Sequence, residues 1–337
     1  MQYREQICVL ELKQIGVVLT ENSLNLLYCF DENYNLQTVT SAYSFLNNYS
    51  GRVSLHLLTS SKNKIKKYTT QLNQFKNLDS INVYEFKKNR DFVFPAIDNH
   101  HVTEATYYRL FINEYLPKTT KDLLYLDSDV ITLNNVTDKI NKIFHKLNIE
   151  KQYLGAVNYT KSTNENNKKF LQSLNMKSDN YFNAGVLFIN YKLWENDYVN
   201  QKILDHTKNM GNLNNLKQHD QDILNSFFDG KFLSLNEEYN FPILERSYKK
   251  DKNFIDHETF FLHYVGREKP WLLNGFFLEI SKYYQKNYFK LYKNYHLIFK
   301  KKLGFKDIKN NFEIRYLLHP KKIYSLFQVI KLYFYKL

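Results

Sequence analysis

Two acidic residues that follow a short apolar run are the strongest candidates for chemistry in this sequence. The segment LLYLDSDV, residues 123–130, places Asp127 and Asp129 directly after residues 123–126. In a strand, side chains two positions apart point the same way, so both carboxylates would face one side. They would repel each other unless a cation joined them, and their oxygen atoms suit Mn²⁺ or Mg²⁺. The alternative is an Asp-rich turn in which one aspartate caps a helix.

A histidine and a lysine further along the chain could complete such a site. The segment FLHYVGREKPW, residues 261–271, places His263 at the end of an apolar run and Lys269 three residues after Gly266. A neutral imidazole can bind a divalent metal, and a lysine ammonium can bind a phosphate as a point charge. The alternatives are a histidine satisfied within the core and a lysine on the surface.

Three further polar segments interrupt or follow apolar runs. The segment DENY, Asp31–Tyr34, carries groups that could bind a base or a ribose, although Asp31 or Asn33 could instead cap the next helix. The segment Asn183-Ala184-Gly185 places an amide and two small residues inside an apolar run, as happens where a ligand approaches the backbone. The segment QHDQD, residues 218–222, opens a helix, where acidic residues also complement the helix dipole.

These groups must be positioned by a sheet whose strands end where the polar segments begin. Short apolar runs alternate with helical patterns, which predicts an α/β domain with a mainly parallel sheet. Right-handed crossovers place the loops after the strands along one edge, where ligands bind in such sheets. The expected strands are residues 25–30, 53–58, 81–86, 123–126, 181–191 and 260–264, the expected helices are 36–46, 62–75, 103–116 and 220–228, and a further short element is expected at 7–12.

Several other site patterns are absent from the sequence. There is no G-x-x-x-x-G-K-[ST] loop, no G-x-G-x-x-G, no G-x-S-x-G and no C-x-x-C. Cys8 and Cys29 are too few for a disulfide framework or a zinc cluster, and they favour a reduced cytoplasmic setting. We expect no signal peptide, and no uncharged apolar run reaches the roughly 18 residues that a transmembrane helix needs.

The formal net charge of +13 is concentrated near the end of the chain. Residues 1–279 carry 33 Lys and Arg against 32 Asp and Glu, whereas residues 280–337 carry 14 against 2. A nucleic-acid-binding protein would be expected to carry a basic face on its body, so this distribution disfavours that class.

The basic segment has the pattern of an amphipathic helix between Glu279 and Lys302. One interpretation packs this helix, together with the apolar residues 323–337, against the body. The other docks both in the plane of an anionic membrane, where each basic residue adds about 1 kcal/mol. One face of the helix would carry Lys282, Lys286, Lys290, Lys293 and Lys300, and the opposite face Ile280, Tyr284, Tyr288, Leu291, Tyr295 and Ile298.

Taken in order, six segments resemble glycosyltransferase family 8, and in particular its bacterial lipopolysaccharide and lipooligosaccharide α-galactosyl- and glucosyltransferases. The resemblance spans residues 24–271. Each motif alone is a weak signal, but six in the family's order are hard to obtain by chance. They are FDENY (30–34), HVTEATYYRL (101–110), LLYLDSDV (123–130), YFNAGVLFIN (181–190), HDQDILN (219–225) and HYVGREKPW (263–271).

The resemblance implies a GT-A fold, in which a nucleotide-binding α/β sheet is joined to a smaller acceptor-binding region. It also implies a UDP-galactose or UDP-glucose donor, a Mn²⁺ (or Mg²⁺) ion and net retention at the anomeric carbon. By motif, the metal would bind Asp127, Asp129 and His263, and the uridine would contact Asp31, Asn33 and Tyr34. Ser128, Gly266 and Lys269 would also contact the donor, the last two through its phosphates. The catalytic centre around the donor sugar would hold Arg109, Asn183, Asp220 and Gln221, with His101 near the donor.

The chemistry of sugar transfer agrees with these implied roles. Departure of UDP leaves negative charge on the diphosphate, which a divalent cation and Lys269 would stabilise. Retention by double displacement needs a good nucleophile, and the amide of Gln221 is a poor one. This favours a front-face reaction, in which the acceptor enters on the side that UDP leaves. The segment Ala156-Val157-Asn158-Tyr159 lacks an aspartate that some members place there, so galactose and glucose both stay open as the donor sugar.

The sequence therefore predicts an N-terminal extension (1–23), a GT-A catalytic domain (24–279) and a basic, aromatic, helical tail (280–337) for membrane attachment. The hypothesis is a cytoplasmic enzyme, peripheral on the inner face of the bacterial plasma membrane. It would transfer a hexose from a UDP-sugar to a cell-surface glycolipid, the lipopolysaccharide or lipooligosaccharide core. The alternatives are a same-fold transferase that acts on a protein such as an adhesin, and a nonenzymatic binder of anionic membranes or nucleic acid.

Overall fold

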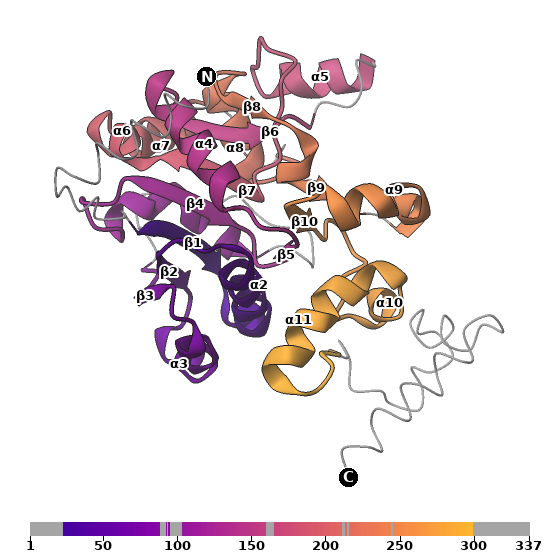
Figure 1. Cartoon of the computed structure of the whole chain (residues 1–337). Coiled ribbons are helices and arrows are strands. Elements are labelled where there is room, and N and C mark those ends of the chain that lie inside the picture. Colours follow the sequence, from indigo (N-terminus) through magenta and orange to yellow (C-terminus); the bar gives the residue numbers. More distant parts are fainter. Residues whose placement is uncertain are drawn as a thin grey trace, which may run out of the picture.

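The computed structural model describes residues 23–87, 92, 94, 103–159, 165–210, 213, 216–243 and 245–298. The expected element at 7–12, His101 and residues 299–337 lie outside these described residues. Within them, a central sheet lies between two layers of helices, and a smaller sheet lies beside it (Figure 1).

Seven strands form the central sheet, in the order β3-β2-β1-β4-β7-β6-β8. Neighbouring strands are parallel except at β7, which runs antiparallel to both β4 and β6. The predicted mainly parallel sheet is therefore confirmed. Near-continuous apolar runs are typical of strands that are covered on both faces. The strands are β1 (Leu24–Phe30), β2 (Val53–Thr59), β3 (Leu78–Glu85), β4 (Asp122–Leu126), β6 (Leu154–Val157), β7 (Val186–Asn190) and β8 (Leu233–Leu235).

Alternate residues of β1 face the two layers of helices, as the pleat of a strand requires. Tyr28 packs into one hydrophobic cluster with α2 and α4, whereas Leu27 and Cys29 pack into a second cluster with η3, α7 and α8. The first layer contains α2 (Asn35–Asn48), α3 (Lys62–Thr69) and α4 (Thr137–Ile149). The second contains the 3-10 helix η3 (Glu104–Glu114), α6 (Tyr191–Asn196), α7 (Val199–Asn209) and α8 (Asp220–Phe228).

Several predicted elements differ in extent from the observed ones. The expected strand 181–191 is wrong at both ends, because Asn183 accepts a hydrogen bond from the Gly185 N–H and turns the chain before β7. At the other end, the side chain of Asn190 caps α6, so the helix begins at Tyr191. The expected helix 62–75 is split into α3 and the 3-10 helix η2 (Thr70–Gln74).

A second sheet of three short strands was not expected. It has the order β5-β10-β9 and consists of β5 (Val130–Thr132), β10 (Phe261–His263) and β9 (Phe241–Pro242). Strand β5 follows Asp129 directly, and β10 pairs antiparallel to it, with His263 opposite Val130. This register brings His263 next to the two aspartates although more than a hundred residues separate them in the sequence.

The start of the basic segment packs against the body of the protein. The predicted helix 279–302 is wrong in extent: the 3-10 helix η6 (Glu279–Ser281) leads into α11 (Lys282–Tyr292), which ends at Lys293 in a left-handed conformation with φ 55°. Its apolar residues Tyr284, Tyr288 and Leu291 are buried, so the packing interpretation holds for α11. In Figure 1, α11 lies beside α2, and the short helix α10 (Leu273–Phe276) lies on the other side of α11. No helix among the described residues is long and apolar enough to span a membrane.

Candidate active site

The acidic pair lies in a turn between the two sheets. Strand β4 ends at Leu126, and β5 begins at Val130, whose N–H donates to the Asp127 carbonyl at 3.1 Å. The Asp127 N–H donates to the Gly185 carbonyl at 2.8 Å. The prediction that strand alternation aligns the carboxylates is therefore wrong, and the turn brings them together instead.

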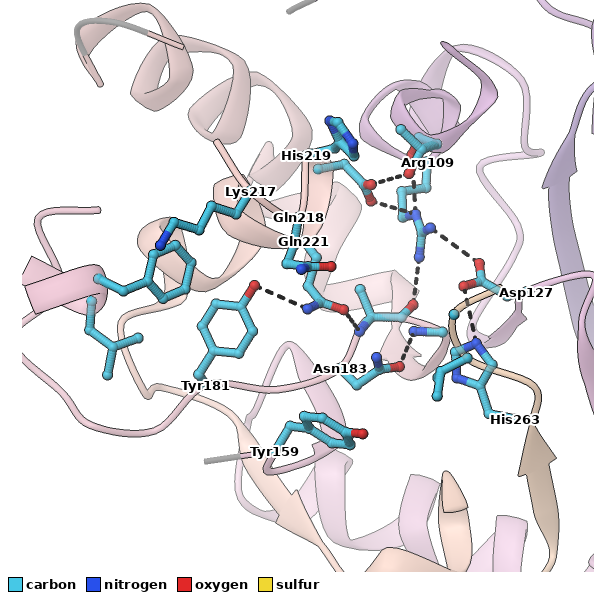
Figure 2. A pocket seen from close by; sticks show the side chains of 18 of the residues that line it. Arg109, Asp127, Tyr159, Tyr181, Asn183, Lys217, Gln218, His219, Gln221 and His263 are labelled. Atoms are coloured by element: carbon cyan, nitrogen blue, oxygen red, sulfur yellow. Dashed lines mark hydrogen bonds and ion pairs between the residues drawn. The ribbon is translucent and has the colours of Figure 1, made fainter. Parts of the chain in front are cut away.

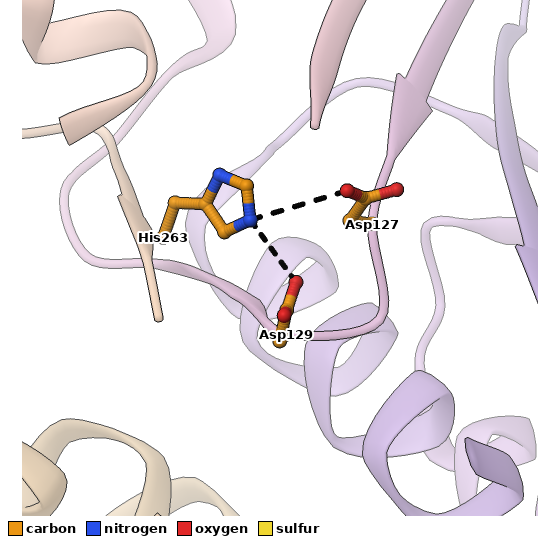
Figure 3. A group of neighbouring side chains, drawn as sticks. All are labelled: Asp127, Asp129 and His263. Carbon is orange, nitrogen blue, oxygen red and sulfur yellow. Dashed lines mark ion pairs between the residues drawn. The ribbon is translucent and has the colours of Figure 1, made fainter. Parts of the chain in front are cut away.

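The structure joins these carboxylates to His263 (Figure 3). The Nε2 atom of His263 lies 3.2 Å from Asp129 Oδ1 and 3.9 Å from Asp127 Oδ2. One ligand atom from each of the three residues lies within 4.8 Å of the others. The structure thus brings together the three residues that the resemblance implies as metal ligands.

This donor set fits a divalent cation. Within the described part of the chain, Asp129 Oδ1 is buried without a hydrogen-bond partner, although it faces the imidazole. A buried carboxylate oxygen without a partner is costly, and a cation would satisfy it. Two carboxylates and an imidazole suit Mn²⁺ or Mg²⁺, and ligands about 2.1 Å from an octahedral ion lie about 3 Å from one another.

Lys269 lies on the opposite side of Asp129 and holds it in place. Its ammonium donates to Asp129 Oδ2 and to the Tyr264 carbonyl, each at 2.5 Å, and its side chain is buried. Burial raises the pKa of Asp129, but the Lys269 ammonium and the neighbouring His263 ring outweigh this effect and hold that pKa well below its usual range. Asp129 is therefore a carboxylate at neutral pH, as a metal ligand must be.

A buried arginine links the acidic turn to α8 (Figure 2). Arg109, from η3, places Nη2 3.1 Å from Asp127 Oδ1 and Nε 2.8 Å from Asp220 Oδ2, and its Nη1 donates to the Ala184 carbonyl at 2.5 Å. Asp220 also accepts a hydrogen bond from Thr106, a residue that the sequence analysis missed. Burial raises the pKa of Asp220 to about 6, against the opposing effect of the Arg109 guanidinium.

The two predicted amides are held firmly in the same wall. Gln221 Oε1 accepts from the Ala184 N–H at 2.9 Å, and its Nε2 donates to the Tyr181 hydroxyl at 3.0 Å (Figure 2). Asn183 Oδ1 accepts from the Gly185 N–H at 2.9 Å and from Asn240 Nδ2 at 2.8 Å. Asn240 was also missed, because nothing in the run EEYNFP distinguishes it from a loop residue.

The DENY segment forms a second wall. Asp31 caps the 3-10 helix η1 (Glu32–Tyr34), its Oδ1 accepting from the Asn33 N–H at 2.8 Å, so the capping alternative is observed. The ring of Tyr34 packs edge-on against Trp271, with centroids 6.1 Å apart. Asp31 and Tyr34 line a cavity, while Asn33 is exposed on the same turn outside that lining.

Two cavities meet at the acidic turn. The smaller one, of about 400 Å³, contains Asp31, Tyr34, Ser128, Asp129 and Gly266 in its lining. The larger one, of about 680 Å³, is lined by Arg109, Asp127, Asn183, Asp220, Gln221, His263 and Lys269 among the predicted residues, and by the unpredicted Tyr159, Phe170 and Lys217. The residues common to both linings are Thr106, Arg109, Asp127, Gln218, Gly266 and Lys269.

Solved structures share this architecture. A crystal structure of the galactosyltransferase LgtC in complex with donor and acceptor sugar analogues is 21% identical, with a TM-score of 0.62 over 85% of this chain and 100% of that one. At this identity the likeness establishes the fold, and it confirms the predicted GT-A-like α/β fold.

Sequence relatives carry the comparison further. A putative glycosyltransferase of Haemophilus influenzae is 28% identical over 74% of this chain and 73% of its own length. A lipopolysaccharide 1,2-glucosyltransferase of Escherichia coli is 28% identical over 78% of each chain. A lipopolysaccharide 1,3-galactosyltransferase of Salmonella typhimurium is 29% identical over 54% of this chain and 53% of its own length. The family profile described as glycosyl transferase family 8 matches residues 25–275, which contain both sheets and every candidate site residue, and the chain belongs to this family.

Proposed function

We propose that this glycosyltransferase moves a hexose, galactose or glucose, from a UDP-sugar to a saccharide acceptor with retention of anomeric configuration. The observation that carries the proposal is the position of the acidic turn. Asp127 lines both cavities, Asp129 lines the smaller one and His263 lines the larger one. A cation held by these three residues would therefore lie where a nucleotide and a sugar ring meet.

The smaller cavity suits the nucleotide part of the donor. Asp31 and Tyr34 offer a carboxylate and an aromatic ring for the uridine, and Ser128 lines the same space. When bound, Mn²⁺ or Mg²⁺ would supply positive charge to the departing diphosphate. Lys269 also lines this cavity, and its positive charge would add to that of the metal. Gly266 lines the same cavity and has no side chain that would block the approach of phosphate oxygens to the backbone.

The donor sugar is expected at the boundary between the cavities. Arg109 lines both cavities, and Asn183 and Asp220 line the larger one. Asp220 is paired with Arg109, and Asn183 is bonded to the Gly185 N–H, so these groups are fixed before any ligand enters. Such fixed polar groups stabilise developing charge without reorganising during the reaction. His101, which lies outside the described residues, stays a prediction.

Gln221 is expected to position the reaction rather than to attack the sugar. Both ends of its amide are already hydrogen-bonded, to the Ala184 N–H and to the Tyr181 hydroxyl. An amide held in this way is a poor nucleophile but a well-placed dipole beside an oxocarbenium-like centre. This supports the front-face course over a double displacement.

The acceptor is expected in the larger cavity. Tyr159 and Phe170 line it away from the acidic turn, and aromatic walls with a few polar groups are typical of small-ligand sites. Two of the relatives are named as lipopolysaccharide hexosyltransferases, which supports a glycolipid oligosaccharide acceptor.

The basic C-terminal segment is proposed to hold the enzyme at the inner face of the plasma membrane. Because the apolar face of α11 is buried, attachment would rest on its exposed lysines and on residues 299–337, which carry 10 Lys and Arg against 2 Asp and Glu. Full-length protein in which Lys300, Lys301 and Lys302 are replaced by glutamine should co-sediment less with anionic vesicles. The same replacement of Lys62, Lys66 and Lys67 on α3 is the charge-matched control, and equal loss in both proteins would contradict a specific role for the tail.

Metal-dependent turnover of the donor tests the enzymatic proposal. Wild-type protein should hydrolyse UDP-galactose or UDP-glucose with Mn²⁺ and lose this turnover when the metal is chelated, and Asp129→Asn should be inactive with Mn²⁺ present. Asp205→Asn, which changes an exposed carboxylate on α7, is the matched control and should retain wild-type turnover. Turnover that survives chelation or Asp129→Asn would overturn the proposal.

A further inference from the structure

A buried amide connects the wall of the larger cavity to His263. Asn240 is 1% exposed and lies just before β9, which pairs with β10 so that Pro242 is opposite His263. Its Nδ2 lies 2.8 Å from Asn183 Oδ1, and its Oδ1 lies 3.0 Å from His263 Nδ1. The amide therefore spans the gap between a residue of the donor-sugar wall and a residue of the metal site.

The polarity of this chain of hydrogen bonds is fixed by the backbone. The Gly185 N–H can only donate, so the Asn183 atom that lies 2.9 Å from it must be the oxygen. Because that oxygen is also the partner of Asn240, the Asn240 atom facing it must be the amino group. The other end of Asn240 is then its carbonyl oxygen, which can only accept, and His263 Nδ1 must carry a proton.

This polarity decides which nitrogen of the neutral imidazole can bind a metal. With the proton on Nδ1, the lone pair is on Nε2, the atom that faces Asp127 and Asp129. Without the amide, the opposite tautomer would gain a hydrogen bond from Nε2–H to Asp129 Oδ1 and lose its metal-binding lone pair.

A glycine also keeps the ring in place. A Cβ atom at Gly185 would collide with Cε1 and Nδ1 of His263, so the ring lies directly against the Gly185 backbone. The same residue thus supplies the space for the imidazole and the N–H that sets the polarity of the hydrogen bonds.

We propose that Asn240 is a positioning residue, which fixes His263 in the Nδ1–H tautomer and so sets the affinity of the site for its divalent cation. The inference rests on the metal site of the proposed function. It adds to that site a residue outside the ligand set, in the role that hydrogen-bonded partners of metal-binding histidines commonly have.

The tautomer is measurable in metal-free protein. Full-length chain labelled with ¹⁵N in its histidines, at about pH 8.5 where an ordinary imidazole is neutral, gives distinct signals for protonated and unprotonated ring nitrogens. The His263 signals are assigned from their loss in His263→Asn. We expect Nδ1–H in the wild type and a shift toward Nε2–H in Asn240→Leu. Nε2–H in the wild type would overturn the proposal.

Metal affinity is measured on the same proteins with Mn²⁺ alone, from the electron paramagnetic resonance signal of the free ion. Asn240→Leu should bind Mn²⁺ about 10- to 100-fold more weakly than wild type. Asn240→Asp keeps an acceptor toward Nδ1–H and should keep the tautomer and most of the affinity. Asn236→Ala, which removes an exposed amide from the same loop, is the control and should bind as wild type does.

The outcomes separate the two proposals. If Asn240→Leu folds but changes neither tautomer nor affinity, Asn240 has no positioning role. If it fails to fold, the wild-type tautomer and Asn240→Asp still decide the matter, because Nε2–H in either protein would contradict the proposed polarity. If wild type binds no Mn²⁺ while His263 shows the expected tautomer, the proposed metal site fails and the positioning role stands.

Discussion

The two cavities share a wall, yet the structure builds them in different ways. Around the smaller one, the carboxylates are paired with buried cations: Asp129 contacts Lys269, and Asp127 contacts Arg109. The far wall of the larger one is aromatic, and Lys217 lies exposed there with its ammonium 4.7 Å from the centre of the Phe170 ring. Buried charges must be paired before the ligand arrives, whereas an aromatic wall can accept ligands of varied shape.

We infer that the departure of the diphosphate depends on the paired charges, whereas selectivity for the acceptor depends on the aromatic wall. The paired charges form a fixed electrostatic environment, which is what stabilisation of a departing diphosphate requires. The aromatic wall is the part that can differ between enzymes that transfer similar sugars to different acceptors. Changes on the two sides should therefore affect different measured quantities.

The largest effect is expected from Asp129→Asn. The change removes one carboxylate of the metal site and leaves the buried Lys269 without its charged partner. We expect sugar transfer to fall by at least about 10²-fold. Initial rates at saturating donor and Mn²⁺ measure the loss of transfer. A loss smaller than that caused by a substitution on the aromatic wall would contradict the assignment of the chemistry to the paired charges.

A smaller effect is expected from Gly185→Ala, which crowds His263 without changing any ligand. Because the new methyl group would collide with the imidazole, Mn²⁺ affinity should fall by about 10- to 100-fold. Gly155→Ala is the matched control, since its added Cβ would find its nearest neighbours at 3.6 Å, an ordinary contact distance. Equal metal affinities for the two variants would show that the ring is not held against Gly185.

Substitution of Phe170 should act on the acceptor alone. Phe170→Leu removes the ring beneath Lys217, and we expect the KM for the acceptor to rise by about two- to fivefold. Donor hydrolysis and Mn²⁺ affinity should stay at wild-type values. Phe289→Leu, at an exposed aromatic on α11, is the control, and a parallel loss of donor hydrolysis in Phe170→Leu would contradict the separation of the two sides.

The smallest effect concerns the pH dependence of stability, which depends on Asp220, the partner of Arg109. The pKa of Asp220 is about 6 in the folded chain against 3.8 for the unperturbed group, so the folded state binds the proton more tightly. Wild type should therefore lose stability relative to Asp220→Asn as the pH rises from about 4 to about 6, and the difference should be constant above that range. Urea unfolding at several pH values measures it, and a difference that grows in favour of wild type over this range would contradict the raised pKa.

Much of the fold could be predicted because local patterns are strong in this chain. Helix α8 has the predicted ends, and the strands before the DENY segment and before the acidic turn lie within a residue of their predicted positions. Strand β10 lies within the predicted strand 260–264, but its pairing into a second sheet could not be predicted, since β9 has two residues and β5 has three, too few to show any periodicity. Helix α11 was overextended because the amphipathic pattern continues past Lys293, where the backbone turns.

The candidate metal ligands could be predicted from the sequence, but the residues that pair or hydrogen-bond with them could not. Asp127, Asp129 and His263 stand at the ends of apolar runs, and the motif order gave them a shared role. The partners of these residues come from distant segments: Lys269 contacts Asp129 across 140 positions, and Asn240 reaches His263 only through the pairing of β9 with β10. Such contacts depend on the tertiary arrangement and leave no mark in the local sequence.

The positions of the metal and the nucleotide can be tested most directly by anomalous diffraction from crystals of the full chain grown with UDP and Mn²⁺. We expect one manganese peak bounded by Asp127, Asp129 and His263, with the diphosphate between that peak and Lys269 and the uridine in the smaller cavity. A nucleotide bound with no manganese among these three residues, or a uridine in the larger cavity, would contradict this expectation.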